Sequence, residues 1–527
     1  MLSRFSPQRP TSKEASSEKS PAPAADAFEV LAATPNFKTE LAARLAELIP
    51  EALADGKLDV VKLKELLGDD VADENERFGL FWPGKKRALR AAQAPTTATL
   101  KPDFVNSKDW DTTQNVFIEG DNLEVLKILQ RHYHSKIKLI YIDPPYNTGK
   151  DFVYPDNYKE GLETYLEWTR QVNEEGRKVS SNSESEGRYH SNWLNMMYPR
   201  LKLARNLLTD DGVIFISIDD NEQDNLKKLC NEVFGEGRFI TQIPWRKRTA
   251  KSDVPYGVSQ DFEWILGFAK SDSFRARVRG KERRYFETPD LAGRRWRIHD
   301  LTKQTTASER PKSFFTIVNP QNGSEYPANP NRTWAITSDT FDDYYEKKRI
   351  VFPGDYDFLN IKQPVFRYFE NDDMEKAGED FGFVAVSTLL PESVGMTKEG
   401  GAEIIELFEE KIFSFPKPSA LIKHLVEISA REDNIILDFF AGSSTTAHAV
   451  MQLNAEDGGN RRFIMVQLPE PTPEDSEARK AGFNTIADIS RRRIELAGEK
   501  IVGALHATPL PDVGFRAYKL TDTHFAK

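Results

Sequence analysis

The feature that most constrains the fold of this chain is a β-α-β alternation that stops in the middle and later resumes. Before residue 270, short runs of β-type apolar residues predict strands at 115–119, 138–142, 212–218 and 262–268. Apolar residues at helical spacing lie between some of these runs, at 123–129 and 194–208. After residue 400 the alternation returns, with helices expected at 404–407 and 421–428 and strands expected at 434–439 and 462–468.

Neither half of this alternation holds enough strands for a well-covered sheet. We therefore expect one doubly wound, mostly parallel α/β domain that an inserted domain splits in two. The two halves would span 101–270 and 401–527, the second with a C-terminal extension, and the inserted domain would span 271–400. Residues 28–100 are expected to form a small helical module that leads into a Pro/Thr-rich linker at 94–102, and residues 1–27 a disordered leader.

Composition excludes several classes of protein and of site. Hydrophobic residues make up 39% and charged residues 29%, which excludes collagen, coiled-coil fibres and membrane-span compositions. Cys230 is the single cysteine, so we expect neither a disulfide framework nor a cysteine-based metal cluster. With no signal-peptide core at the N-terminus, a cytoplasmic protein without a metal site or a membrane partner is expected. The net charge of -10 by itself argues weakly against a nucleic-acid partner.

The tetrapeptide Asp143-Pro144-Pro145-Tyr146 directly follows the expected strand at 138–142. In a parallel sheet this is the carboxyl end of a strand, where ligand sites gather. The two prolines fix φ and donate no N–H, but their carbonyls remain acceptors. The turn therefore offers two kinds of acceptor and an aromatic ring, which suits a planar exocyclic amino group. An ordinary loop opener followed by a packing tyrosine is the alternative.

A second motif, Leu437 to Thr446 (LDFFAGSSTT), also follows an expected strand and opens a helix. Its small residues let the backbone approach a ligand closely, and a helix N-terminus presents free N–H groups. The sequence Gly-Lys-Ser/Thr is absent from it, so a P-loop is not expected. A helix simply capped by Ser or Thr is the alternative.

Together these two motifs resemble those of the amino-methylating DNA methyltransferases, which act with S-adenosylmethionine on adenine N6 or cytosine N4. The catalytic motif precedes the glycine motif, as in the family's β group, whose target-recognition domain lies between the two. The resemblance implies the S-adenosylmethionine methyltransferase fold with a permuted motif order. Longer strings within residues 75–500 are similar to the Mod subunit of type III restriction-modification systems: WPGKK (82–86), FIEGDNLEVLKIL (117–129), DPPYNTGKDFVYPDNY (143–158) and FSFPKPSALI (413–422).

The resemblance implies a role for each motif residue. Asp143 and the Pro144 carbonyl would bind the target amino group, Pro145 would complete the rigid turn, and Tyr146 would stack on the flipped base. The cofactor S-adenosylmethionine would be held by Asp121, Lys417, Asp438, Phe440, Ala441, Gly442, Ser444, Gln467 and Glu470.

Several of these cofactor residues carry an open alternative. Asp121 with Glu124 also forms a good helix capping box. Ser444 replaces the second glycine of the family motif. Gln467 and the later Glu470 stand where family members usually carry an acidic residue that binds the ribose. Lys417 begins a Lys-Pro pair that in the family packs near the methionine moiety, and a Pro-rich turn before a helix is its ordinary equivalent.

Basic residues concentrate in one part of the chain. Residues 245–300 hold fourteen Lys plus Arg against eight Asp plus Glu, a net charge of +6 that leaves -16 for the rest. They alternate with aromatic residues, which fits phosphate contacts combined with contacts to bases. A solvated charged surface is the alternative. The residues expected to contact DNA are Arg246, Lys247, Arg248, Lys251, Arg283, Arg284, Arg294 and Arg295.

We therefore expect a site-specific methyltransferase that flips an adenine out of double-stranded DNA and methylates its N6. Cytosine N4 is the alternative target, because the DPPY motif does not choose between two exocyclic amines. The type III resemblance implies a homodimer and a separate Res-type helicase-nuclease subunit. A solitary methyltransferase, or a sequence-reading subunit without a nuclease partner, is the other alternative.

Overall fold

The computed structural model describes residues 79–148, 189–249, 255–504 and 510–522, together with scattered residues between 45 and 66. The expected leader, most of the expected helical module and Lys251 lie outside the described residues. In the part that is described, no helix is both long and apolar enough to cross a membrane. No group of three or more His, Cys, Asp or Glu among these residues could hold a metal ion.

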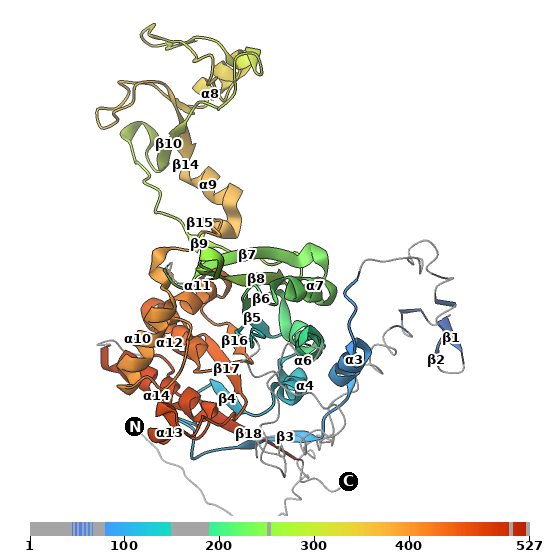
Figure 1. The fold of residues 1–527 in the computed structure, drawn as a ribbon. Coiled ribbons are helices and arrows are strands. Elements are labelled where there is room, and N and C mark those ends of the chain that lie inside the picture. The colour runs from blue at the N-terminus through green and yellow to red at the C-terminus, as the bar shows by residue number, and fades with distance from the viewer. Residues whose placement is uncertain are drawn as a thin grey trace, which may run out of the picture.

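A nine-stranded sheet forms the centre of the described structure, with the strand order β3-β18-β4-β17-β16-β5-β6-β8-β7 (Figure 1). Six consecutive strands run parallel: β18 (Arg516–Asp522), β4 (Val116–Glu119), β17 (Arg462–Gln467), β16 (Ile435–Asp438), β5 (Ile137–Ile142) and β6 (Leu208–Ile218). Strands from before residue 270 and strands from after residue 400 are thus interleaved in one sheet. The expected doubly wound, mostly parallel α/β fold is confirmed.

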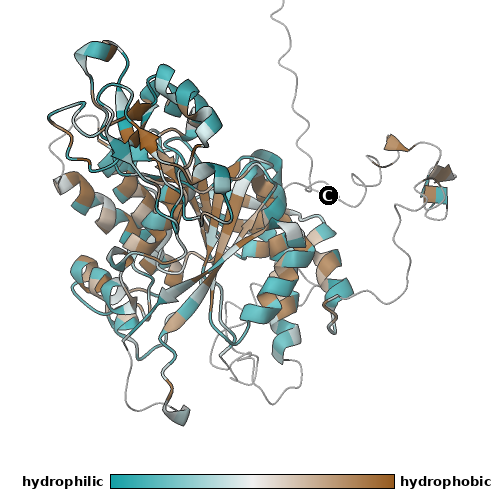
Figure 2. Ribbon diagram, turned by 90° about the horizontal axis from the view of Figure 1, so that it is seen from above, coloured by the Kyte–Doolittle hydropathy of each residue, from teal (hydrophilic) through white to brown (hydrophobic). Residues whose placement is uncertain are grey.

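Helices cover both faces of this sheet, and the alternation of side chains along each strand decides which face a residue serves. In β5, Ile140 and Ile142 pack into one core, whereas Leu139 and Tyr141 pack into the other. The first core includes α3 (Lys85–Gln93), α4 (Asn122–Tyr133), α6 (Tyr189–Leu207) and α7 (Gln223–Phe234). The second includes α11 (Ser419–Ser429), α12 (Thr445–Asp457) and α14 (Ile486–Ala504). Figure 2 shows the resulting apolar centre, with hydrophilic positions on the helices around it.

One edge of the sheet is built from segments far apart in the chain. Strand β18 (Arg516–Asp522) lies between β4, to which it is parallel, and β3 (Ala98–Pro102), to which it is antiparallel. The expectation of a linker across 94–102 is wrong for residues 98–102, which form this edge strand. Their hydrogen-bonding partners come from the far end of the chain, so the local Pro/Thr-rich composition could not indicate a strand.

The other edge is an antiparallel hairpin of β7 (Phe239–Arg246) and β8 (Phe262–Ala269), and β8 pairs with β6. Because β8 runs opposite to β6, its first residues lie beside the last residues of β6, with Trp264 opposite Ile218. Arg246 at the end of β7 lies opposite Phe262. The hairpin therefore places the end of β7 and the start of β8 at the same end of the sheet as the carboxyl ends of the parallel strands.

The segment between β8 and α10 (Thr397–Phe408) projects away from the sheet (Figure 1). At its base β9 (Val278–Arg279) pairs with β15 (Phe383–Val384). Further out, β10 (Trp296–Asp300), β14 (Val365–Phe369) and β13 (Ile350–Val351) form a small antiparallel sheet next to α8 (Phe341–Glu346) and α9 (Glu370–Ala377). This segment has apolar clusters of its own, around Trp334 and Trp296. The limits of 271 and 400 for an inserted domain stay a prediction.

Candidate active site

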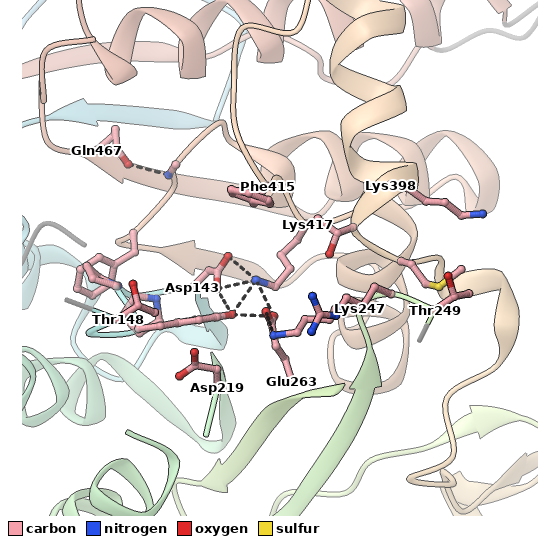
Figure 3. Close-up of a pocket in the computed structure, with 18 residues that line it drawn as sticks. Asp143, Thr148, Asp219, Lys247, Thr249, Glu263, Lys398, Phe415, Lys417 and Gln467 are labelled. Atoms are coloured by element: carbon pink, nitrogen blue, oxygen red, sulfur yellow. Dashed lines mark hydrogen bonds and ion pairs between the residues drawn. The ribbon is translucent and has the colours of Figure 1, made fainter. Parts of the chain in front are cut away.

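A cavity of about 800 Å³ opens at the sheet edge where the parallel strands end (Figure 3). Its walls come from the turns after β5 and β16, from Gln467 at the end of β17, from Asp219 after β6, from the β7–β8 hairpin and from the segments around the starts of α10 and α11. The residues that line the cavity include Asp143, Pro144, Tyr146, Lys247, Glu263, Phe415, Lys417, Phe440, Gly442 and Gln467.

The turn Asp143 to Tyr146 leaves β5 and forms one wall of this cavity. Trp193 donates its Nε1 hydrogen to the Pro145 carbonyl (2.7 Å), which fixes the turn against α6. Among the described residues no backbone N–H donates to the Pro144 carbonyl. The Tyr146 hydroxyl lies 2.8 Å from Asp143 Oδ1. Burial raises the pKa of Tyr146 well above its usual value, and Asp143 adds to the rise, so the phenol stays neutral.

Lys417 lies against the Asp143 carboxylate. From the sequence we expected Lys417 near the methionine moiety of the cofactor and did not predict this contact. The Lys417 Nζ atom is 3.0 and 2.9 Å from the two oxygens of Asp143 and 2.7 Å from the Tyr146 hydroxyl. The side chain is only 9% exposed. Burial alone would lower the pKa of the Lys417 ammonium, but Asp143 and Glu263 raise it above the usual value. Lys417 is therefore a cation inside the cavity.

Glu263, a residue that the sequence analysis missed, completes this group of charges. Its Oε2 atom lies 3.1 Å from the Tyr146 hydroxyl and 3.4 Å from Lys417 Nζ. Its Oε1 atom lies 3.3 Å from Lys247 Nζ. Burial would raise the pKa of Glu263, yet Lys417 and Lys247 lower it below the usual value. The signal in the sequence was a single acidic residue within the apolar run FEWILGF.

The glycine turn between β16 and α12 forms a second wall. Gly442 has φ of +54°, a conformation that favours glycine, and a Cβ atom there would approach Phe413 to 3.5 Å. The Gly442 N–H donates to Gln467 Oε1 (2.7 Å), and its carbonyl accepts a hydrogen bond from the Ser490 hydroxyl. Phe440 and Gln467 line the cavity beside Gly442.

Ser444 and Ala441, two other expected cofactor residues, are buried in the same turn. Ser444 has φ of +63° and precedes the first residue of α12, so a serine holds a backbone conformation that suits the family's glycine. Within the described structure its hydroxyl is buried without a hydrogen-bond partner. Neither residue lines the cavity.

Asp438 holds the two sides of the glycine turn together through hydrogen bonds. Its Oδ1 atom accepts the Phe440 N–H (3.0 Å), and its Oδ2 atom accepts the Thr446 hydroxyl (2.6 Å). Burial raises the pKa of Asp438 to about 7, against the opposing effect of these two hydrogen bonds. The carboxyl group is not part of the cavity wall. Its geometry fits a brace of the turn better than a contact to a ligand.

Asp121 caps α4, the alternative that the sequence left open. Its Oδ1 atom accepts the N–H groups of Leu123 (3.0 Å) and Glu124 (3.1 Å), and Arg200 approaches its other oxygen to 3.3 Å. Glu124 binds Lys127 (2.7 Å). Asp121 does not line the cavity, and neither does Glu470, whose pKa burial raises to about 7.

The basic residues expected to contact DNA fall into two groups. Lys247 and Arg248 line the cavity next to the exposed Arg246, and the Arg248 Nε atom donates to the Gln260 carbonyl (3.2 Å). The others lie in the projecting segment and differ in their partners. Arg283 and Arg295 form ion pairs with Asp373 (3.5 Å) and Glu370 (3.2 Å), whereas Arg284 and Arg294 lie 5.2 and 3.9 Å from the ring centres of Phe286 and Phe369.

Comparison with known proteins places the chain in a family. A family model described as DNA methylase matches residues 137–471. The chain is 35% identical over 490 residues to the type III restriction-modification enzyme StyLTI Mod subunit of Salmonella typhimurium, covering 89% of this chain and 70% of that protein. It is 31% identical over 507 residues to the EcoPI Mod subunit of Escherichia phage P1, covering 88% and 75%. The resemblance stated above is confirmed, and the chain belongs to the DNA methylase family, among relatives that include type III Mod subunits.

Proposed function

We propose that this protein transfers a methyl group from S-adenosylmethionine to adenine N6 in double-stranded DNA, as the modification subunit of a type III restriction-modification system. One observation carries the proposal: the turn of Asp143 and the turn of Gly442, far apart in the sequence, line one cavity. Its volume of about 800 Å³ lies within the range of ordinary ligand pockets. The names of the StyLTI and EcoPI relatives support the assignment to a modification subunit.

The cavity wall around Gly442 fits a nucleoside cofactor. Phe440 and Phe415 offer aromatic surface for a purine ring, and Gly442 leaves room that a side chain would fill. Gln467 lines the same wall, where its Oε1 atom accepts the Gly442 N–H (2.7 Å) and its Nε2 atom donates to the Leu468 carbonyl (3.1 Å). S-adenosylmethionine, when bound, supplies a methyl group on a positively charged sulfur.

The DPPY turn supplies what an adenine amino group needs. The Asp143 carboxylate and the Pro144 carbonyl are acceptors for its two hydrogens, and the Tyr146 ring offers a surface for the flipped base. A carboxylate beside the nitrogen also favours the positive charge that develops there as the new bond forms. The remaining contribution of the chain is to hold the nitrogen in line with the methyl group.

DNA and a Res-type subunit are the partners that we propose. The basic residues around Lys247 and in the projecting segment would contact phosphates. We propose that a separate Res-type helicase-nuclease acts together with this chain and that the chain forms a homodimer, as its resemblance to type III Mod subunits implies. Light scattering would give the molar mass of the purified protein and so test for a dimer. Co-purification with the product of a neighbouring gene would test for the complex with a Res-type subunit.

The test is direct. Purified protein, S-adenosylmethionine and DNA are incubated, the DNA is digested to nucleosides, and N6-methyladenosine (as the deoxynucleoside) is sought by mass spectrometry. N4-methyldeoxycytidine in its place would change the target base and keep the enzyme class. The absence of any methylated nucleoside would overturn the proposal. Modification-sensitive long-read sequencing of the same DNA would give the recognised sequence.

A further inference from the structure

The cavity holds more charge than the proposed reaction uses. Asp143 and Glu263 supply two carboxylates, and Lys417 and Lys247 supply two cations, joined through the contacts of Lys417 and Glu263 (Figure 3). These residues come from four separate places in the chain, and Lys417 is the residue that touches both carboxylates. The proposed chemistry assigns a part only to Asp143.

More acceptor oxygens lie around Lys417 than its ammonium group can hydrogen-bond at once. Four oxygens lie near Nζ: the two of Asp143 at 3.0 and 2.9 Å, the Tyr146 hydroxyl at 2.7 Å and one oxygen of Glu263 at 3.4 Å. An ammonium group has three hydrogens. Lys417 can therefore leave Asp143 and still keep two partners, Tyr146 and Glu263, without a large movement.

The ion pair of Lys417 with Asp143 opposes the proposed role of Asp143. Each Asp143 oxygen can accept a second hydrogen bond, so the target amino group could still bind there, but the Lys417 ammonium lies within bonding distance of both oxygens. A cation in this place offsets the negative charge that should stabilise the developing positive charge on the target nitrogen. Movement of the ammonium away from Asp143 would restore that negative charge beside the nitrogen.

We propose that Glu263 is a positioning residue that takes over the Lys417 ammonium when the target amino group reaches Asp143. In the structure the Lys417 ammonium is hydrogen-bonded to the Asp143 carboxylate that the amino group would also contact. Glu263 is suited to receive the ammonium, because its carboxylate lies 3.4 Å from Lys417 Nζ and its backbone is paired with Trp245 of β7. The exchange moves one cation between two carboxylates and changes no covalent bond. This inference rests on the proposed function.

Binding to two duplexes isolates the effect of the amino group. One duplex carries adenine at the target position, and the other carries purine, which lacks the 6-amino group. Affinity is measured by fluorescence anisotropy with S-adenosylhomocysteine present. Glu263→Gln should weaken binding of the adenine duplex about tenfold, since the ammonium stays on Asp143, and should leave the purine duplex nearly unchanged. An equal loss on both duplexes would indicate a structural role and overturn the proposal.

Removing the ammonium gives the decisive second measurement. Lys417→Met in the Glu263→Gln background deletes one charge of each sign and should restore the preference for adenine over purine. Lys417→Met alone should also keep or raise this preference, which covers the case in which Glu263→Gln does not fold. If neither lysine variant shows the preference, the proposal is wrong.

The matched control is the surface pair of Lys423 and Glu456, which joins α11 to α12 outside the cavity. Glu456→Gln and Lys423→Met should change neither affinity. Methylation of DNA by the parental enzyme distinguishes a failure of the proposed function from a failure of the role assigned to Glu263. If the parental enzyme methylates no DNA, the proposed function fails, whereas a methylating parent without the predicted preferences overturns only the part assigned to Glu263.

Discussion

The Lys417 ammonium and the Asp143 carboxylate form a partly buried ion pair across 274 residues of sequence, with Nζ 3.0 and 2.9 Å from the two oxygens. Lys417 comes from the segment before α11, and Asp143 comes from the turn after β5. Their meeting joins the two halves of the α/β domain at the cavity. Removing one member of this pair leaves the other charge without its main partner.

Asp143→Ala should reduce methyl transfer at least about 100-fold, because the target amino group loses a charged acceptor. Cofactor affinity should change little, because the wall around Gly442 is untouched. Transfer of tritiated methyl groups to DNA and equilibrium dialysis of S-adenosylhomocysteine measure the two quantities. Transfer at the parental rate would refute the assignment of Asp143 as the amino-group acceptor.

Tyr146 variants should separate the ring from the hydroxyl. Tyr146→Phe keeps the stacking surface and removes the hydrogen bond to Asp143, so we expect a loss of about tenfold or less in kcat. Tyr146→Ala removes the ring as well and should weaken binding of the flipped base by about 1–3 kcal/mol. Single-turnover rates and duplex affinities distinguish the two. Equal effects of both variants on affinity would argue against stacking.

Ser444→Gly should stabilise the protein by about 1 kcal/mol, because the serine has a positive φ and glycine adopts it without strain. The substitution also removes a hydroxyl that is buried without a partner among the described residues. Denaturant unfolding of the parent and the variant gives the difference. Ser443→Gly is the contrasting control, because the Ser443 hydroxyl accepts a hydrogen bond from Arg493 (2.7 Å) and its loss should destabilise the protein. A destabilised Ser444→Gly would contradict the argument from strain.

Asp438 should make stability depend on pH between about 4 and 7. Burial raises the pKa of Asp438 from 3.8 to about 7, so its contribution to folding is fully present below about 4 and is lost as the pH rises through about 7. The rise corresponds to up to about 4 kcal/mol, at about 1.4 kcal/mol per pKa unit. The free energy of unfolding of Asp438→Asn should fall less over this range than that of the parent. Parallel curves for the two proteins would disprove the prediction.

The arginines of the projecting segment should differ in their contribution to DNA binding. Arg295 is paired with Glu370, whereas Arg294 lies over the Phe369 ring and makes no ion pair within the described structure. Arg294→Ala should therefore reduce the slope of log K against log salt by about 1, and Arg295→Ala should reduce it less. Titrations at several salt concentrations measure both slopes. An unchanged slope for Arg294→Ala would remove it from the expected DNA-binding residues.

Much of the fold could be predicted from the sequence because its signals are local. The runs at 138–142 and 462–468 are apolar and short, and the structure has β5 and β17 there. The turn after β5 and Gln467, the last residue of β17, line the cavity because the carboxyl ends of parallel strands lie at one end of the sheet. Strand β3 escaped prediction because its hydrogen-bonding partner β18 lies at the other end of the chain.

The sequence by itself determined the α/β class, and local chemistry with strand position pointed to an amino-group site at Asp143 and Tyr146 and to a close backbone approach at Gly442. That the order of the two motifs is permuted, and that Gly442 would hold S-adenosylmethionine, followed from the resemblance to the family. Only the tertiary structure decided that Asp121 caps a helix, that Asp438 braces the glycine turn and that Lys417 and Glu263 lie with Asp143. The physical reason is that a charge acts over a few ångströms of space, whereas sequence separation says little about distance once an antiparallel hairpin and an insertion lie between the residues.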